Sequence, residues 1–140
     1  MAIQRVTLES LGPDLGFRAT GGVSGATMTV GMPGPDGAPA PKAMELLSMG
    51  LGLCMAGMTM EILEKKRIRY GKIGVVVESD RGEHGFTAMA VRLSVESDQL
   101  DAETLQKVID LAGKHCPAHA TLGHGVPITA TGELLPGAGR

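Results

Sequence analysis

Two cysteines are the residues of this sequence with the most distinctive chemistry, since thiolates are strong nucleophiles and metal ligands. Cys116 directly precedes Pro117. Because proline favours the first position of a helix and keeps the preceding residue out of the helical region, we expect Cys116 at the N-cap of a short helix that ends near Gly123. A thiol there faces the positive end of the helix dipole, which favours the thiolate. Residue chemistry alone therefore predicts that Cys116 is the more reactive cysteine.

Cys54 lies in the middle of a long apolar segment. Residues 46–60 are almost wholly apolar, and the surrounding stretch 41–69 opens with proline and closes with a run of charged residues, which is typical of one long helix. Burial in such a helix raises the pKa of a thiol and makes it unreactive unless a charge is brought near. Three glycines interrupt the apolar run and indicate that another backbone passes close by: Gly50, Gly52 and Gly57.

The apolar run is too short for a membrane span. It is bounded by Glu45 and Glu61, whereas a transmembrane helix needs about 20 apolar residues. We therefore expect a core helix, enclosed by a sheet of its own chain or by a second chain.

A zinc site is the alternative use of the second cysteine. Histidine and thiolate are the ligands that zinc prefers, and the candidates are His115, Cys116, His119 and His124, with Cys54 as a further ligand. However, His115 and Cys116 are adjacent, and no second paired motif completes a set of four. We therefore predict no metal and no cofactor.

Composition excludes several partner classes. The formal net charge is -2, and no Lys/Arg stripe with stacking aromatic residues appears, so neither nucleic acid nor a membrane surface is expected as a partner. The amino terminus alternates like a strand and not like a signal peptide, which predicts a cytoplasmic protein. With 140 residues, the chain is expected to form a single domain.

The remaining patterns predict an α+β domain, with strands grouped before and after the long helix. Alternation or apolar runs indicate strands at 1–10, 17–20, 26–30, 73–77, 86–95 and 126–134. A second, amphipathic helix is predicted over 101–113. Residues 31–41 are rich in Pro and Gly and are predicted to be a flexible loop, and 136–140 a disordered tail.

Two motifs together resemble the OsmC/Ohr family (osmotically inducible protein C and organic hydroperoxide resistance protein). The first is Met44-Glu45-Leu46-Leu47 ahead of Cys54, and the second is the Cys-Pro motif at Lys114 to Leu122. The resemblance covers residues 15–134 and is nearest to an OsmC-like subset of less certain function. It implies antiparallel sheets wrapped around a long central helix, in an intertwined homodimer.

The resemblance also implies a thiol peroxidase that reduces organic hydroperoxides. Cys54 would be the peroxidatic thiolate, and its sulfenic acid would condense with Cys116 to a disulfide. A dithiol reductant, a lipoyl protein or a thioredoxin-like protein, would then regenerate the thiols.

Two positions depart from the family pattern. Family peroxidases hold the thiolate with an Arg in a Gly-Gly-Arg turn, where this chain has Val23, and Arg18 is the candidate to replace it. The family Glu lies ten residues before the cysteine, whereas Glu45 lies nine before Cys54. Nine helical residues turn Glu45 to the opposite side of the helix, so it would meet the cysteine of a partner chain across a dimer.

A non-enzymatic function is the alternative. A dimer with a cleft lined by Met and Leu side chains at the thiols would bind a small apolar ligand or sense redox state.

Overall fold

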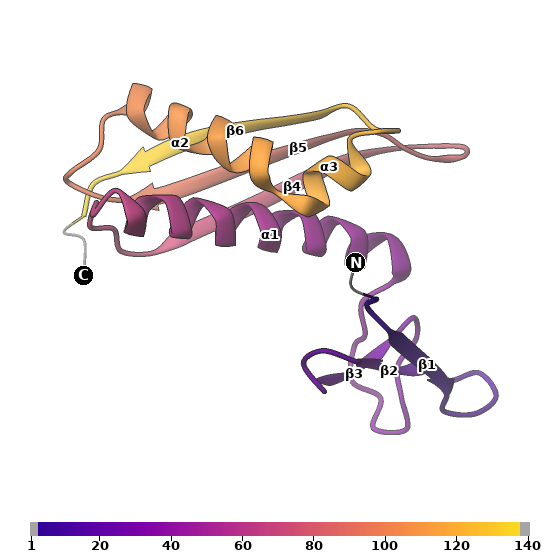
Figure 1. Cartoon of the computed structure of the whole chain (residues 1–140). Helices are drawn as coiled ribbons and strands as arrows, with labels where there is room; N and C mark the ends of the chain where they lie inside the picture. Colours follow the sequence, from indigo (N-terminus) through magenta and orange to yellow (C-terminus); the bar gives the residue numbers. More distant parts are fainter. Residues whose placement is uncertain (1–2, 138–140) are drawn as a thin grey trace. The chain divides into compact units, whose positions relative to one another are not determined.

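The computed structural model describes residues 3–137, and it confirms the α+β class. The chain divides into two compact units, with the boundary between Leu47 and Ser48. We call them the amino-terminal unit and the carboxy-terminal unit. The long helix begins in the first and continues into the second (Figure 1).

The amino-terminal unit contains a three-stranded antiparallel sheet in the order β1-β2-β3. Its strands are β1 (Val6–Ser10), β2 (Phe17–Gly21) and β3 (Thr27–Val30). All three were expected, although β1 begins at Val6 and not at the chain start. Arg18 lies on the central strand, opposite Glu9 of β1 and Thr29 of β3.

The Pro/Gly-rich segment 31–41 contains no helix or strand, as predicted. Its two ends are joined by a hydrogen bond in which Gly31 N donates to the Pro41 carbonyl at 2.8 Å. Gly31 and Gly37 have φ values of 87° and 75°, which glycine adopts without strain.

Helix α1 (Ala43–Lys65) has a defined start and end. At its start, Glu45 Oε1 accepts a hydrogen bond from Lys42 N at 3.0 Å, so that the third helical residue caps the first turn. At its end, Arg67 takes a left-handed conformation with φ 57°, and Ile68 N donates to the Leu63 carbonyl at 2.9 Å. This is a Schellman motif with arginine where glycine is usual.

The carboxy-terminal unit is built on a second three-stranded sheet, in the order β4-β5-β6. Strands β4 (Ile73–Gly82) and β5 (Gly85–Glu96) form a long hairpin. The sequence indicated a broad turn over 80–85, but an irregularity between Asp80 and Arg81 lets the strands pair as far as Gly82 and Gly85. Both strands are therefore longer than predicted.

One strand pairing differs from the antiparallel sheets that we expected. Strand β6 (Ile128–Leu135) runs parallel to β5, so this sheet is mixed. The reason is the connection: α2 (Ala102–His115) and α3 (Pro117–Leu122) carry the chain back along the sheet before β6 begins.

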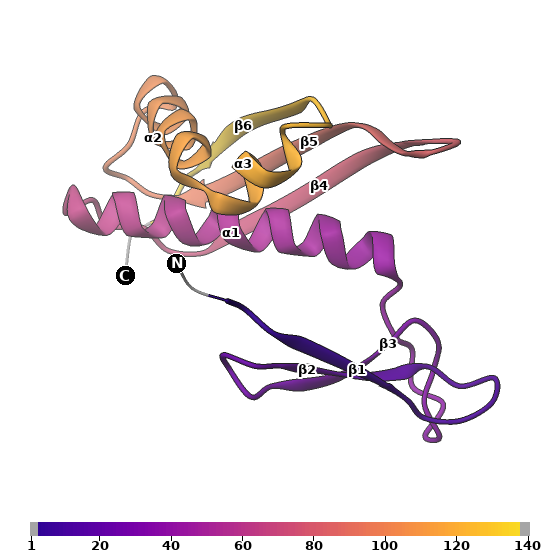
Figure 2. The ribbon, with the colours of Figure 1, turned by 45° about the vertical axis from the view of Figure 1, so that its right-hand side comes forward.

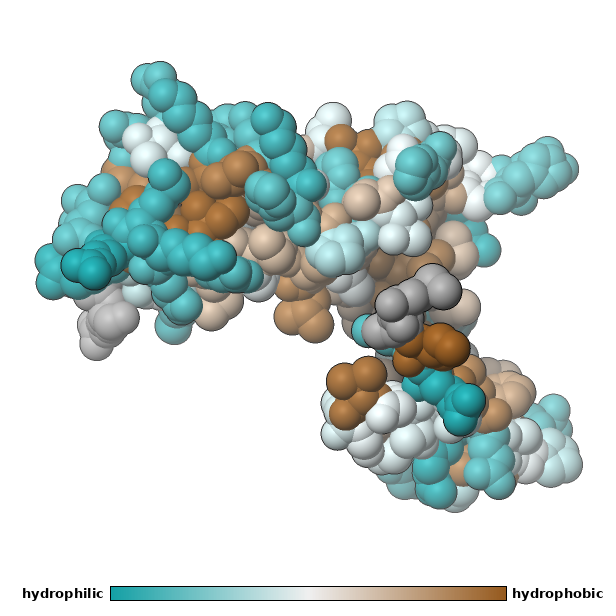
Figure 3. All heavy atoms as spheres, in the orientation of Figure 1, coloured by the Kyte–Doolittle hydropathy of each residue, from teal (hydrophilic) through white to brown (hydrophobic). Residues whose placement is uncertain are grey.

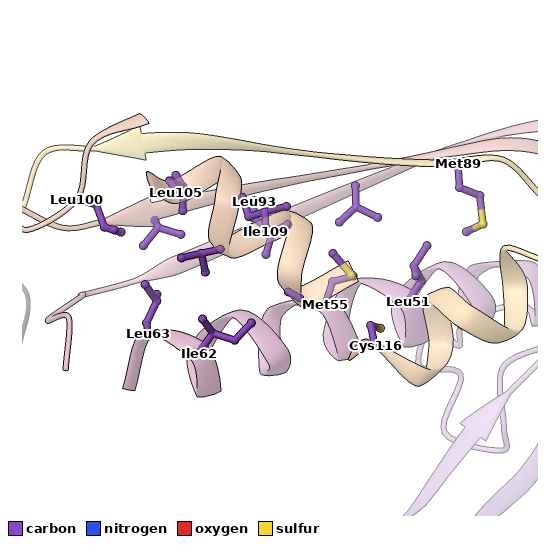
Figure 4. Packing of buried hydrophobic residues seen from close by; sticks show 14 residues of the cluster. Leu51, Met55, Ile62, Leu63, Met89, Leu93, Leu100, Leu105, Ile109 and Cys116 are labelled. Carbon is purple, nitrogen blue, oxygen red and sulfur yellow. The ribbon is translucent and has the colours of Figure 1, made fainter. Parts of the chain in front are cut away.

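Helices α1 and α2 lie on one face of this sheet, as Figure 2 shows. The core between them contains aliphatic and methionine side chains from all these layers, among them Leu51, Met55, Leu63, Met89, Leu93, Leu105 and Ile109 (Figure 4). Gly132 of β6 allows α2 to pack closely, because a Cβ atom at this position would lie 2.4 Å from Ile109 Cδ1.

Within the described residues, α1 is the one helix whose length and composition would allow it to cross a bilayer. Its buried residues Leu51, Met55, Thr59 and Leu63 contribute to the core, as in the core helix of a globular domain. Gly52 faces β4, where a Cβ atom would lie 2.9 Å from Val77 Cγ2. Here the close neighbour of the glycine is a side chain, and not the backbone that we expected.

The predicted disordered tail, 136–140, lies largely outside the described residues. Of its members, Gly137 is described, and its N–H donates to Asp98 Oδ1 at 3.2 Å.

Candidate functional site

Three helices bring the two cysteines to one place in the carboxy-terminal unit. Cys54 lies in the middle of α1, whereas Cys116 is both the C-cap of α2 and the N-cap of α3. The predicted N-cap position is confirmed: Cys116 has an extended backbone, Pro117 begins α3, and Cys116 Sγ accepts a hydrogen bond from His119 N at 3.4 Å. The local sequence thus fixes the direction of this thiol.

The Cys54 and Cys116 thiols are neighbours in the fold. Neither forms a disulfide in this structure. The Cys116 side chain is completely buried, between Met55 and Leu51 in the view of Figure 4, while Cys54 is half-buried. Of the two sulfur atoms, that of Cys54 is therefore the more open to a molecule from solvent.

Burial raises the pKa of the Cys116 thiol, and the adjacent Cys54 thiol raises it further. The hydrogen bond from His119 N acts in the opposite direction but does not outweigh burial. This direction is opposite to the one expected from the position of Cys116 at a helix N-terminus. Helix dipole and amide favour its thiolate, but desolvation in the core costs more.

Such a pair can act as a two-electron redox couple. Two neighbouring thiols can be joined by a disulfide with the loss of two electrons and two protons. The raised pKa of the buried Cys116 thiol favours its protonated form.

A groove is lined by residues of α1 and α2. It has a volume of about 420 Å³ and is lined by apolar and charged side chains, namely Met58, Glu61, Ile62, Lys65, Lys66, Leu111 and His115. Met58 lies one helical turn beyond Cys54, and His115 precedes Cys116. The groove therefore extends from the helical turn after Cys54 to the cationic end of α1.

The structure places the other two predicted site residues in the amino-terminal unit. Glu45 is exposed and bonds to the start of its own helix, and Arg18 is exposed on β2. Val23, which stands where the family arginine would be, lies in the β2–β3 turn and is 80% exposed. Of the four predicted site residues, the structure therefore brings together the two cysteines, whereas Arg18 and Glu45 lie in the other unit.

One feature of the site was missed from the sequence. His119 was considered as a zinc ligand, whereas its backbone N–H donates to the Cys116 sulfur. The signal that could have found this bond is the position of His119 three residues after the N-cap. Across residues 3–137, no group of three or more His, Cys, Asp or Glu side chains is arranged to hold a metal ion.

Comparisons with known proteins agree with this architecture. A model of the OsmC-like protein family matches residues 34–131. A solved structure of an OsmC-like protein from Mycoplasma pneumoniae shares 20% sequence identity and a TM-score of 0.80, over 96% of this chain and 98% of that one. The structure of a hypothetical protein from Aquifex aeolicus VF5 shares 19% sequence identity and a TM-score of 0.81, over 98% of this chain and 99% of that one.

The organic hydroperoxide resistance protein OhrB of Bacillus subtilis is also similar, with 21% identity and a TM-score of 0.61, over 94% of this chain and 98% of that one. A search of curated proteins found no match.

Proposed function

Because the chain belongs to the OsmC-like protein family, we propose that it is a cysteine-based thiol peroxidase that reduces organic hydroperoxides. The juxtaposition of the Cys54 and Cys116 thiols carries this proposal. A solved neighbour is named an organic hydroperoxide resistance protein, which supports the substrate class. The reaction needs no metal or cofactor, because both electrons come from the thiols.

In the first step, the Cys54 thiolate attacks the terminal oxygen of the hydroperoxide. The O–O bond breaks, Cys54 becomes a sulfenic acid, and the departing alkoxide takes a proton to give the alcohol. Cys54 suits this role since it is half-buried, whereas Cys116 is buried. The neutral Cys116 thiol can donate its hydrogen bond to the Cys54 thiolate and so stabilise the nucleophile.

In the second step, the Cys116 sulfur attacks the Cys54 sulfenic acid. A disulfide forms, and hydroxide leaves with the Cys116 proton as water. The two thiols are already neighbours, so a large movement is not needed. An external dithiol, on a lipoyl protein or a thioredoxin-like protein in the cytoplasm, then reduces the disulfide by two thiol–disulfide exchanges.

Two further residues belong to the proposed site. Arg18 would hold the Cys54 thiolate and polarise the peroxide, in place of the arginine that Val23 replaces. Glu45 would act across a dimer on the partner's cysteine, in addition to its bond with Lys42 N. Arg18 is exposed on its strand, and its guanidinium is therefore free to take part in an intersubunit site.

The dimer is proposed from one face of α1. Apolar side chains remain at the surface of the carboxy-terminal unit in the region of α1 (Figure 3). Leu53 is 77% exposed and Met49 53%, and this face also carries Gly50 and Gly57, whose Cβ positions meet no atom within 4 Å. We call these four residues and Met60 the α1 apolar stripe. A second copy packed on the stripe would bury it, and the glycines would allow close approach of the helices.

Thiol titration tests the peroxidase. A slight excess of cumene hydroperoxide should consume two thiols per chain and yield an intrachain Cys54–Cys116 disulfide, measured by mass spectrometry before and after reduction. Unchanged thiols after this treatment would reject the enzyme. The alternative, a non-enzymatic binder of a small apolar ligand, predicts instead a ligand that co-purifies in native mass spectra and survives substitution of both cysteines.

A further inference from the structure

A second concave site lies at the far end of α1, in the segment that leads into β4. It is a groove of about 920 Å³ lined by Glu64, Arg67, Ile68, Arg69, Tyr70, Gly71, Lys72 and Glu96. We call it the α1–β4 groove. None of its residues belongs to the proposed peroxidase site. Its volume lies in the range of small-molecule sites, roughly 300–1,000 Å³.

The backbone of this groove is fixed by hydrogen bonds. Arg69 is held through both backbone groups: its N–H donates to Gln99 Oε1 at 2.6 Å, and its carbonyl accepts from Ser97 Oγ at 2.6 Å. Gly71 N donates to the Glu96 carbonyl at 2.8 Å. The charged side chains therefore project from a preformed surface and not from a loose loop.

The groove contains three cations and two carboxylates, and its cations are not paired with them. Among residues 3–137, neither Arg67, Arg69 nor Lys72 forms an ion pair. The two carboxylates of the groove bond to neutral donors instead: Glu64 Oε1 accepts from Tyr70 OH at 2.7 Å, and Glu96 Oε1 accepts from Lys72 N at 2.9 Å. The bond to Glu64 also raises the pKa of Tyr70 and keeps this hydroxyl protonated.

We propose that the α1–β4 groove binds a small, soluble organic phosphate that also carries hydroxyl groups, such as a sugar phosphate. Arginine side chains hold phosphate with paired, charge-assisted hydrogen bonds, and Lys72 adds a third cation. The second oxygens of Glu64 and Glu96 accept hydrogen bonds from ligand hydroxyls, and Tyr70 offers an aromatic ring.

Two larger partners fit the groove less well. A flat bilayer does not enter a groove, so the phosphates of an anionic membrane would not reach its lining. A nucleic acid needs a longer basic stripe than this one segment of a chain with net charge -2. The unmatched cations therefore favour a compact anion.

Titration of isotope-labelled, full-length protein with ribose 5-phosphate at constant ionic strength tests the proposal. We expect saturable NMR shifts in the amides of 67–72 and 96, weaker shifts with inorganic phosphate, and none with ribose. The double variant Arg69→Gln/Lys72→Gln should weaken ribose 5-phosphate binding at least about tenfold. The matched control Arg81→Gln/Lys107→Gln, with the same loss of charge elsewhere, should bind like the unmodified chain.

Arg67→Gly separates binding from folding. Glycine removes one cation and also relieves the left-handed conformation of Arg67, so thermal stability should hold or rise while affinity for ribose 5-phosphate falls. Cys54→Ser should bind unchanged, which makes the outcome independent of the peroxidase. Three outcomes would each overturn the proposal. The first is NMR shifts that never saturate, and the second is equal binding of ribose 5-phosphate by the Arg69→Gln/Lys72→Gln variant. The third is sedimentation of the protein with phosphatidylglycerol vesicles without binding of ribose 5-phosphate.

Discussion

The thiol of Cys116, at the junction of α2 and α3, lies beside the thiol of Cys54 in α1. The two residues are 62 positions apart in the sequence, and of the two only Cys54 is partly exposed to solvent. We propose that this difference in exposure makes Cys54 the attacking sulfur and Cys116 the resolving sulfur, and the first two predictions depend on it.

Single substitutions should separate the two roles. Cys54→Ser should abolish hydroperoxide reduction, because it removes the accessible nucleophile. Cys116→Ser should still react once and then accumulate a Cys54 sulfenic acid, since no second thiol can condense with it. Trapping with dimedone and mass spectrometry measures this intermediate. Full turnover by Cys54→Ser with Cys116 intact would contradict the assignment.

Stability should fall at alkaline pH because of Cys116. Its pKa is raised in the folded state, so above pH about 9 the unfolded chain loses this proton while the folded chain keeps it. The free energy of unfolding then decreases, by at most about 1.4 kcal/mol per pH unit for one group. Urea unfolding of reduced protein at pH 7 and pH 10 should show a larger loss than the same measurement on Cys116→Ala. Equal losses in the two proteins would argue against a raised pKa.

Arg18 should matter for rate and not for folding. Arg18→Gln removes the cation proposed to hold the thiolate and the peroxide, so kcat/KM for cumene hydroperoxide should fall at least about tenfold. Arg5→Gln, which removes a charge from the same amino-terminal unit, is the matched control and should keep its rate. If both variants keep full activity, another residue has replaced the family arginine.

The α1 apolar stripe should control assembly. Leu53→Glu places a charge on its most exposed member and should convert a dimer to monomers in sedimentation velocity. Val76→Glu is the control, because Val76 is likewise an exposed apolar residue, at 53%, but lies on β4 and outside the stripe. A monomer at all concentrations in the unmodified protein would end the dimer proposal.

Gly132→Ala tests the packing of α2 on the sheet. The added methyl would lie 2.4 Å from Ile109 Cδ1 and 3.0 Å from Leu105 Cδ2, so the helix must shift, at a cost of about 1–3 kcal/mol in the free energy of unfolding. Gly125→Ala, whose Cβ meets no atom within 4 Å, should leave the denaturation midpoint almost unchanged.

Local patterns predicted most elements but not how they pair. Apolar periodicity and Pro117 located the helices and the N-cap at Cys116, since both signals act over a few residues. The parallel pairing of β6 with β5 depends on the path of α2 and α3, which strand periodicity does not encode. The tight hairpin after Asp80 depends on an irregularity in strand pairing, and polar turn residues do not specify it.

The chemistry of the site was less predictable than its location. The Cys-Pro motif favours a thiolate at Cys116, whereas its pKa is raised by burial in the core that contains Leu51 and Met55. Burial is a property of the whole fold. The helix α1 is apolar on all sides, so its sequence could not tell which face packs on the sheet and which forms the stripe. Contact between the two cysteines was expected from the family resemblance and not from spacing.

The complete burial of Cys116 has a practical consequence for spectroscopy. A bulky maleimide can reach one sulfur in the native chain, that of Cys54. A fluorophore or spin label can therefore be attached at the centre of α1 without mutagenesis, next to the face through which two copies are proposed to meet. Distances between such labels would report directly on the association of the subunits.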